Sequence, residues 1–444
     1  MISIFLVTVI FVMWRPRGIN EALPTSIAAA TVLVIGFVPL TDMVSILKIV
    51  SGASITILST IVMSIVLESI GFFRWAALNL AIKAKGSGVL LFWYINLLCF
   101  LMTLFFNNDG SILITTPIII HTLSMLKLKP HQKVPFLISG ALVATAASAP
   151  IGVSNLANLI SLQIVGLDLN TYAKMMFVPS MLGIGCMALM LFLIFRKDIS
   201  IGYKTNMNQQ FMIENSSMRS HPLSSRPQQG TDIDWKMFRI SIGVVIATRL
   251  SFFVLAPLGI PTEWPAIIGA IILILIRWFK KQIGPADVLR KSPWSIILFA
   301  FSMYIIIYGL HNSGMTALIV KQFGDTVATS PFHAIFTMGG LLTVLSNLCN
   351  NLPSVMIGTL SIKEMGLDLH LQQISYLANV IGADIGSLIL PMGTLASLLW
   401  MHTLRQHNVP MHWGKYLQVT IVVVPLSLFV SLLGLFIWTS YVSF

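Results

Sequence analysis

Charged residues are scarce in this chain. Only 9% of its 444 residues are Asp, Glu, Lys or Arg and 56% are hydrophobic, whereas soluble domains carry about 25% charged residues. This deficit excludes a soluble globular fold. Several apolar runs, among them 24–40, 53–67, 88–106 and 416–439, are long enough to cross about 30 Å of hydrocarbon as helices. The composition therefore predicts a polytopic membrane protein.

Cysteines and catalytic motifs are also sparse. Cys99, Cys186 and Cys349 lie in apolar segments without metal-ligand spacing, which predicts small hydrophobic side chains and neither a disulfide framework nor a metal site. The three histidines between 402 and 412 have a spacing of five residues that does not suit metal ligands on a helix, so we expect a solvated loop. No HExxH, nucleophile motif or catalytic His and carboxylate pair occurs. The sequence indicates neither an enzyme nor a cofactor.

One long polar stretch, residues 197–236, divides the chain. Its composition, as in ENSSMRSHPLSSRPQQG, cannot bury a core, so we expect a flexible linker between two transmembrane units, 1–196 and 237–444. Five matched segments follow in the same order in both units, 240 to 243 residues apart; NNDGS from Asn107, for example, matches NNLPS from Asn350. This fixed spacing predicts an internal repeat.

Each unit is expected to contain about five spanning helices, with a helical hairpin and an interrupted helix that meet near the bilayer midplane. The expected segments are 2–14 (a retained helix rather than a cleaved signal), 24–40, 53–73, the hairpin 88–126, the interrupted helix 133–165 and 175–196, then 238–256, 265–279, 293–311, the hairpin 331–362, the interrupted helix 371–405 and 416–440. A cytoplasmic linker places 22 of the 27 Lys and Arg residues on the cytoplasmic side, as the positive-inside rule requires. The repeat is then inverted, both termini are extracytoplasmic, and the net charge of +12 needs no nucleic acid.

Four clusters of Gly, Pro, Asn and Ser interrupt the apolar segments, two in each unit. Backbone at lipid depth is tolerated in such breaks only where it faces protein or a water-filled cavity. Inverted symmetry brings the breaks together, and their amides and hydroxyls offer donors and acceptors to a small polar solute. A packing contact or an interfacial turn is the alternative for each cluster taken alone. The candidate substrate-binding residues are Asn107, Asn108, Ser111, Ser154, Asn155, Asn158, Asn347, Asn350, Asn351, Ser354, Gly393, Thr394 and Ser397.

Charged residues within the spans indicate function more specifically than the polar clusters do, because an ionised group at bilayer depth is costly and usually functional. Asp109 and Asp384 lie inside the clusters. A carboxyl group that binds and releases a proton there would couple transport to a proton gradient, and a helix-capping role is the alternative for both. Glu68 lies near a helix end and is expected to snorkel. Arg249 is interpreted as a counter-ion or a structural partner.

Three motifs, FNNDGSILITTPI, VSNLANLIS and IGADIGSLILPMGTLASLLW, resemble the signature regions of the bacterial arsenical pump membrane protein family, within the ion transporter superfamily. The resemblance covers essentially the whole chain and is most specific from Gly382 to Trp400. It implies a multi-pass inner-membrane exporter of neutral arsenite or antimonite, working by proton antiport alone or with a cytoplasmic ATPase subunit.

The family's motif residues fall on Asn108, Asp109, Ser154, Asn155 and 391–396. The chain departs from the family pattern at Ser387 and Leu388, where many members have Pro-Lys. The loss of a positive charge there would change the pairing of Asp384. Cys349 lies in the third cluster, but a tight bond from a thiol to arsenic would hinder release, so we expect it at most to line the site.

The sequence thus predicts a secondary active exporter with an alternating-access mechanism. In it, protonation of Asp109 or Asp384 alternates with binding of a neutral trihydroxy solute. A sodium/proton antiporter or a sodium-coupled anion carrier of the same architecture is the alternative. A passive channel fits less well, because it would not need interrupted helices in symmetric pairs.

Overall fold

The computed structural model of the chain describes residues 1–14, 19–199, 235–281, 284–409 and 411–441. Most of the linker predicted to be flexible, residues 200–234, lies outside this range. In the described ranges the secondary structure is helical and contains no strand, and seven helices are long and apolar enough to cross a membrane. The predicted all-α polytopic membrane fold is confirmed.

The first half contains a set of helices that ends with a hairpin, an interrupted helix and one long span. These are α1 (Ile2–Trp14), α2 (Ala22–Ile35), α3 (Met43–Ser69), α4 (Phe72–Lys83), the hairpin α5 (Gly88–Phe105) and α6 (Asn108–Met125), the interrupted pair α7 (Pro130–Ala146) and α8 (Leu156–Val165), and α9 (Leu169–Ile199). Short 3₁₀ turns lie at Leu40–Asp42 and Gly152–Ser154.

The second half repeats this order. It contains α11 (Trp235–Leu255), α12 (Glu263–Lys281), the short α13 (Ala286–Lys291), α14 (Ser295–Asn312), α15 (Met315–Thr329), the hairpin α16 (Pro331–Cys349) and α17 (Asn351–Glu364), the interrupted pair α18 (Leu369–Asp384) and α19 (Leu395–Gln406), and α20 (Trp413–Tyr441). Gly386–Ile389 forms a 3₁₀ turn in the break between α18 and α19.

Three helices, α4, α13 and α15, escaped prediction because they are too short or too polar to be recognised as spans. Both α4 and α15 follow a glycine that ends the preceding span, Gly71 with φ 81° and Gly314 with φ 82°. Only glycine adopts this left-handed backbone at little cost. The two glycines lie at equivalent positions of the halves, so α4 and α15 also obey the repeat. Three bounds were wrong by five residues or more: α2 ends at Ile35 rather than 40, α3 begins at Met43 rather than 53, and α9 begins at Leu169 rather than 175.

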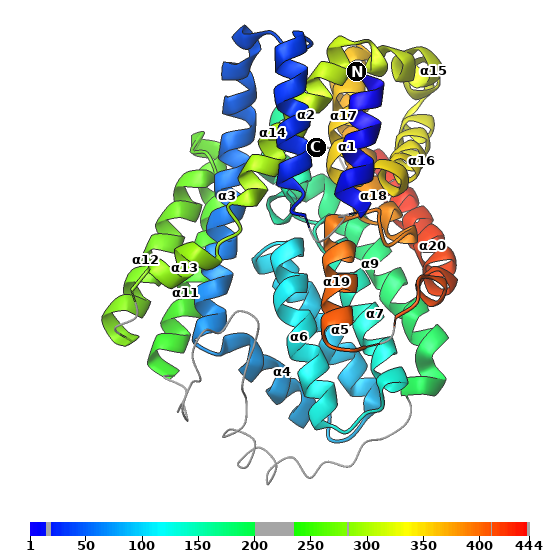
Figure 1. The fold of residues 1–444 in the computed structure, drawn as a ribbon. Coiled ribbons are helices and arrows are strands. Elements are labelled where there is room, and N and C mark those ends of the chain that lie inside the picture. Colours follow the sequence, from blue (N-terminus) through cyan, green and yellow to red (C-terminus); the bar gives the residue numbers. More distant parts are fainter. Residues whose placement is uncertain (15–18, 200–234, 282–283, 410, 442–444) are drawn as a thin grey trace.

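The two halves are inverted with respect to each other. The hairpin α5–α6 lies in the lower half of Figure 1, and the equivalent hairpin α16–α17 lies in the upper half. Half-helices of one repeat pack against half-helices of the other, because α6 contacts α19 and α8 contacts α17. Since α6 is equivalent to α17 and α8 to α19, these two contacts are related by the same pseudo-two-fold axis.

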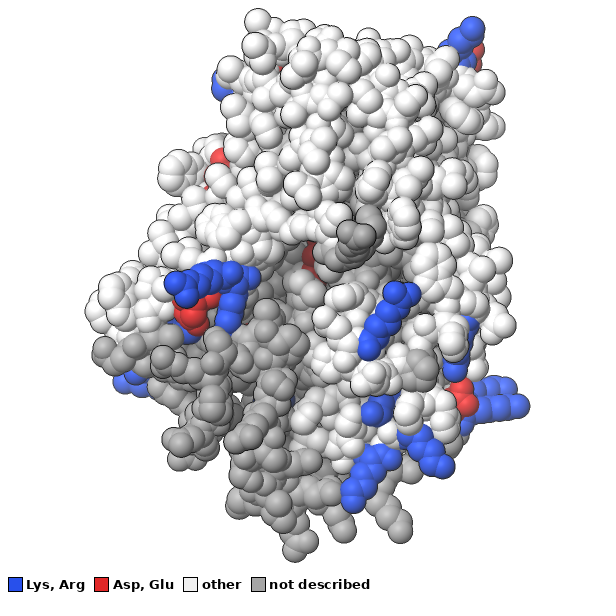
Figure 2. Space-filling model, viewed as in Figure 1, with Lys and Arg blue, Asp and Glu red and all other residues white. Residues whose placement is uncertain are grey.

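Long apolar helices surround this centre. The most extensive packing joins α9 to α20, and α3 packs between α12, α14 and α8. On the face shown in Figure 2, Lys and Arg gather in the lower half and are sparse in the upper half.

Close approach between α9 and α20 depends on a glycine. A Cβ atom on Gly183 would lie 2.7 Å from Ser431 Cβ and 3.1 Å from the carbonyl oxygen of Ser427, whereas a Cβ on Gly185, two residues further on, would meet nothing within 4 Å. We therefore expect Gly183→Ala to destabilise the protein by about 1–3 kcal/mol through overpacking. Thermal unfolding of the detergent-solubilised protein measures the loss. Gly185→Ala is the matched control, and equal melting temperatures for the two variants would contradict the packing assignment.

Candidate functional site

The site begins with the local chemistry of the four helix breaks. Asn155 caps the N-terminus of α8, where its Oδ1 accepts the backbone N–H of Ala157 at 3.0 Å. Thr394 caps α19 in the same way, with its Oγ1 accepting the N–H of Ser397 at 3.0 Å. Both are preferred N-cap residue types, because their side chains satisfy a donor that the helix leaves open. Polar residues in these apolar runs thus start new helices inside the protein.

The two hairpin tips differ in backbone conformation. Asn350, between α16 and α17, has φ 75° and ψ 155°, whereas its counterpart Asn107, before α6, is extended. The conformation of Asn350 is one that essentially only glycine adopts, and a side chain held there costs about 1–3 kcal/mol. Such strain persists where the surroundings fix it. Here Asn350 N–H donates to the carbonyl of Ser346 at 2.9 Å, and the hydroxyl of Ser354 donates back to the Asn350 carbonyl at 2.7 Å.

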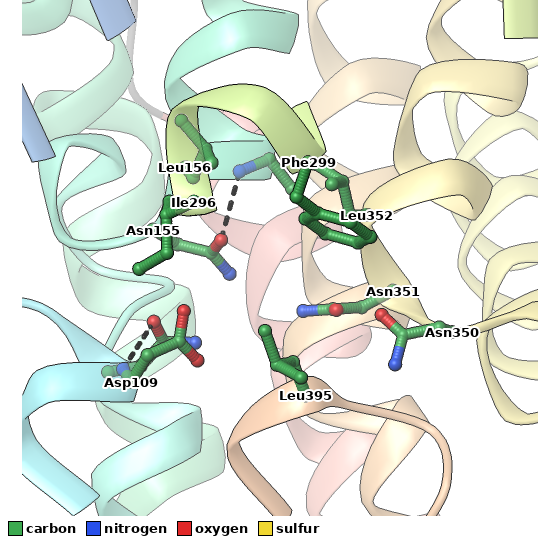
Figure 3. Close-up of a pocket in the computed structure, with 11 residues that line it drawn as sticks. Asp109, Asn155, Leu156, Ile296, Phe299, Asn350, Asn351, Leu352 and Leu395 are labelled. Atoms are coloured by element: carbon green, nitrogen blue, oxygen red, sulfur yellow. Dashed lines mark hydrogen bonds between the residues drawn. The ribbon is translucent and has the colours of Figure 1, made fainter. Parts of the chain in front are cut away.

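A cavity lies where the breaks meet (Figure 3). Its volume is about 30 Å³, well below the roughly 300–1,000 Å³ of typical ligand pockets and enough for about one or two water molecules. The lining residues come from α6, α8, α14, α17 and α19 and the caps before them: Asn108, Asp109, Asn155, Leu156, Ala157, Ile296, Phe299, Asn350, Asn351, Leu352 and Leu395.

The N-termini of four half-helices converge on this cavity. It is lined by the first residues of α6, of α8, of α17 and of α19, that is by Asn108, Leu156, Asn351 and Leu395. A helix N-terminus presents unpaired N–H groups and about half a positive charge. The cavity therefore offers several backbone donors to electron-rich oxygen atoms. Asp109, in the first turn of α6, adds a carboxylate that points into the cavity in Figure 3.

Asp384 lies behind the cavity wall, at the end of α18, and is fully buried. Its carboxylate accepts three hydrogen bonds, all from the first repeat. Ser148 Oγ donates at 2.8 Å, Asn155 Nδ2 at 2.8 Å and Asn158 Nδ2 at 2.6 Å. Asn155 also lines the cavity, so one amide separates the solute space from the buried carboxylate.

The sequence left two roles open for Arg249, a counter-ion or a structural partner. The structure shows that it is a structural partner. It lies on α11, is buried, and donates from Nε to the carbonyl of Phe105 and from Nη2 to that of Phe106. These carbonyls end α5, so the guanidinium closes the C-terminal end of the first hairpin helix, where cations are favoured. The second repeat thereby holds the tip of the first repeat's hairpin.

The predicted site residues fall into two groups. Five of the amides and carboxylates line the cavity, namely Asn108, Asp109, Asn155, Asn350 and Asn351. The others lie around it and do not line it: Asn107, Ser111, Ser154, Asn158, Asn347, Ser354, Asp384, Gly393, Thr394 and Ser397.

Several members of the second group have internal partners. Asn347 Nδ2 donates to the carbonyl of Gly386 at 2.9 Å, and its Oδ1 accepts the N–H of Leu390 at 2.8 Å, so this amide closes the break of α18. Asn107 differs: its amide is buried, and within the described ranges neither its nitrogen nor its oxygen has a hydrogen-bond partner. Cys349 is half-buried and is not among the lining residues.

Apolar lining residues escaped prediction. Ile296 and Phe299 come from α14, which carries no polar break. No sequence signal separates them from other apolar residues of a span. Leu352 could have been predicted to line the cavity, because the repeat aligns it with Asp109. Ser148 also escaped prediction, although it lies inside the second polar cluster.

The Arg249 contacts predict a stability loss. Arg249→Met leaves the carbonyls of Phe105 and Phe106 without their donor, and an unsatisfied buried polar group costs about 1–3 kcal/mol. Thermal unfolding in detergent measures this. Arg239→Met, on the exposed face of the same helix, is the matched control and is expected to leave the melting temperature unchanged. An Arg249→Met variant as stable as that control would show that the guanidinium does not hold the tip.

The strained backbone of Asn350 predicts opposite effects on stability and binding. Asn350→Gly relieves the φ 75° conformation and is expected to stabilise the fold by about 1 kcal/mol, whereas Asn350→Ala keeps the strain. Both variants lose the amide at the cavity. We expect both to bind solute more weakly, with only the glycine variant melting at a higher temperature than the wild type. Thermal unfolding with and without solute separates the two effects, and a glycine variant that melts lower would contradict the strain.

Known proteins resemble this chain over nearly its whole length. A family model described as arsenical pump membrane protein matches residues 1–439. A Bacillus subtilis (strain 168) protein, whose name marks it provisionally as an arsenical pump membrane protein, is 48% identical and the alignment covers 98% of this chain and 99% of that protein. The arsenical pump membrane protein of Escherichia coli is 35% identical, covering 99% and 98% of the two chains.

Solved structures support the fold. The YdaH transporter of Alcanivorax borkumensis, described as having an unusual topology, superposes with a TM-score of 0.55 at 12% identity, covering 90% of this chain and 88% of that one. The likeness extends through both halves and shows the architecture. The family model matches nearly the whole sequence, and both named relatives align with the chain from end to end. The chain therefore belongs to the arsenical pump membrane protein family.

Proposed function

We propose that this protein exports arsenite or antimonite across the cell membrane in exchange for protons, by alternating access. The observation that carries the proposal is the convergence of four helix N-termini on one cavity beside Asp109. Family membership supports the arsenical solute, since the relatives are named arsenical pumps. The predicted substrate-binding residues of the lining, Asn108, Asn155, Asn350 and Asn351, are proposed to contact the solute.

The charge balance of the cavity suits a neutral solute. Four helix N-termini contribute about two positive charges in total. The carboxylates of Asp109 and Asp384 offset this charge when both are ionised. Arsenite in its trihydroxy form is neutral, accepts hydrogen bonds through its oxygen lone pairs and donates them through its hydroxyls. Backbone N–H groups and amides satisfy the former, and the Asp109 carboxylate accepts from the latter.

Antiport follows from competition at Asp109. A carboxylate that accepts a hydrogen bond from a solute hydroxyl cannot do so equally well once it is protonated. Proton binding and solute binding therefore weaken each other at this group, and such negative coupling is the thermodynamic requirement for exchange. Asp384 is proposed as a second proton site, linked to the cavity through the Asn155 amide. We propose no metal or cofactor for this step.

Orientation is part of the proposal. We place the segment between α9 and α11 in the cytoplasm and both termini outside, which agrees with the positive-inside rule and with the basic side chains in the lower half of Figure 2. A proton gradient would then drive export without an ATPase. An ATPase subunit, where present, would dock on this basic side.

The proton-coupled mechanism predicts the phenotype of Asp109→Asn. The amide keeps the size of the side chain but cannot exchange a proton, so we expect everted vesicles with a proton gradient to accumulate arsenite with the wild type and only to background with this variant. Radiolabelled or mass-detected arsenite uptake, with and without a protonophore, measures it. Asp325→Asn, on the exposed face of α15, should transport like the wild type.

Two outcomes would contradict the proposal. Undiminished accumulation by a folded Asp109→Asn variant would remove Asp109 from the mechanism. Uptake that depends on a sodium gradient and does not respond to arsenite or antimonite would favour the sodium-coupled alternative of the same architecture.

A further inference from the structure

The hydroxyl group of Ser148 lies between two acceptors. Its Oγ is 2.8 Å from Asp384 Oδ2 and 2.7 Å from the backbone carbonyl oxygen of Thr145. A hydroxyl has one hydrogen to donate and two lone pairs with which to accept. It can therefore donate to only one of these two acceptors at a time.

The other partners of Asp384 are less adaptable. The amide of Asn155 is fixed in orientation, because its Oδ1 caps α8 through the N–H of Ala157 and only its Nδ2 can face the carboxylate. Asn158 also presents its Nδ2, at 2.6 Å from Asp384 Oδ2. Both amides are donors in this arrangement. The Oδ1 of Asn158 has no hydrogen-bond partner among the described residues, so Asn158 could accept from a protonated carboxyl group only by turning its whole amide over.

Ser148 can serve both protonation states of Asp384. When the carboxylate is ionised, the hydroxyl donates to Asp384 Oδ2. When Oδ2 carries a proton, that proton is donated to Ser148 Oγ and the hydroxyl turns to donate to the Thr145 carbonyl. No heavy atom has to move, and no buried group loses all of its partners, which would otherwise cost about 1–3 kcal/mol.

We propose that Ser148 is the positioning residue that lets Asp384 hold a proton in the dry interior, by rotating its hydroxyl between the Asp384 carboxylate and the Thr145 carbonyl. This inference deepens the proposed function, because Asp384 is the second proton site of that proposal. It concerns only the carboxyl group and its neighbours, so it can be tested without transport.

The other ionisable groups around Asp384 are few. Tyr172 of α9 and Tyr376 of α18 lie beside it, and their hydroxyls donate to the carbonyls of Ala149 and Asn158 at 2.6 and 3.0 Å. On α20, Tyr416 donates to the Leu388 carbonyl. The other close charge is Asp109 of α6. The Lys, Arg, Asp, Glu and His residues on the packed helices α9, α16, α17 and α20, and the remaining one on α18, lie near helix ends: Lys174, Arg196, Lys197, Asp198, His333, Lys363, Glu364, Lys415 and His370.

Infrared difference spectroscopy of the purified full-length protein tests the inference. The carbonyl stretch of a protonated carboxyl group is followed as a function of pH, and Asp384→Asn identifies the band of this residue. In Ser148→Ala the ionised form loses a charge-assisted hydrogen bond and the neutral form loses an ordinary, weaker one. We expect the midpoint of the titration to move by about one unit towards higher pH, since one unit corresponds to about 1.4 kcal/mol.

Two further variants separate this role from simple packing. Ser148→Thr keeps the hydroxyl and is expected to restore the wild-type midpoint and the wild-type band frequency. Ser139→Ala, at a fully buried serine of α7, is expected to leave both unchanged. Should the threonine not fold in so tight a site, Ser148→Gly provides a second removal of the hydroxyl and is expected to shift like the alanine variant.

The outcomes are separable from those of the transport assay. An unchanged midpoint in Ser148→Ala, a shift towards lower pH, or the absence of any Asp384-dependent band would overturn the inference. Vesicles that fail to move arsenite while the infrared titration shifts as expected would refute the proposed function and leave the Ser148 assignment intact.

Discussion

The buried carboxyl group of Asp384 is the point on which the two repeats depend. It belongs to the second repeat, and its three hydrogen-bond donors, Ser148, Asn155 and Asn158, belong to the first. A carboxylate without partners in such an interior would cost several kcal/mol, whereas a hydrogen-bonded one is tolerated. The same contacts hold the N-cap of α8 in place at the cavity. These three bonds therefore join the two repeats at the place where they also shape the site.

Broken helices impose a second constraint, because every interruption leaves backbone groups without intrahelical partners. At helix ends that point away from the cavity, side chains supply the missing hydrogen bonds. Arg249 donates to the carbonyl groups at the end of α5, and Asn347 donates to the backbone in the break after α18. At the N-terminal ends that face the cavity, Asn155 and Thr394 each satisfy one N–H group of α8 and α19. The remaining N–H groups of these first turns are the ones we propose to be available to a solute.

Much of this could be predicted from the sequence, because Gly, Pro and Asn cluster inside apolar spans mainly where a helix is broken and its backbone faces protein or a cavity. The repeat spacing predicted the order of elements, and the basic residues indicated an inverted pair. Side-chain partners could not be predicted in the same way. Asn158 and Asn347 look like site amides in the sequence, yet each serves an internal acceptor, because packing between distant helices decides which polar group an amide meets. Phe299 lines the cavity through packing alone.

The symmetry of the scaffold does not extend to its chemistry. The repeat aligns Asn108 with Asn351, and both line the cavity, but it aligns Asp109 with Leu352. Likewise Asp384 has Val143 at the equivalent position of the first repeat. Each repeat thus contributes one carboxyl group at a position where the other has an apolar side chain. One carboxyl points into the cavity and the other is enclosed by amides and a hydroxyl. Because their surroundings differ, the mechanism we propose has a proton and a solute compete at the first while the second holds a proton out of reach of the solute.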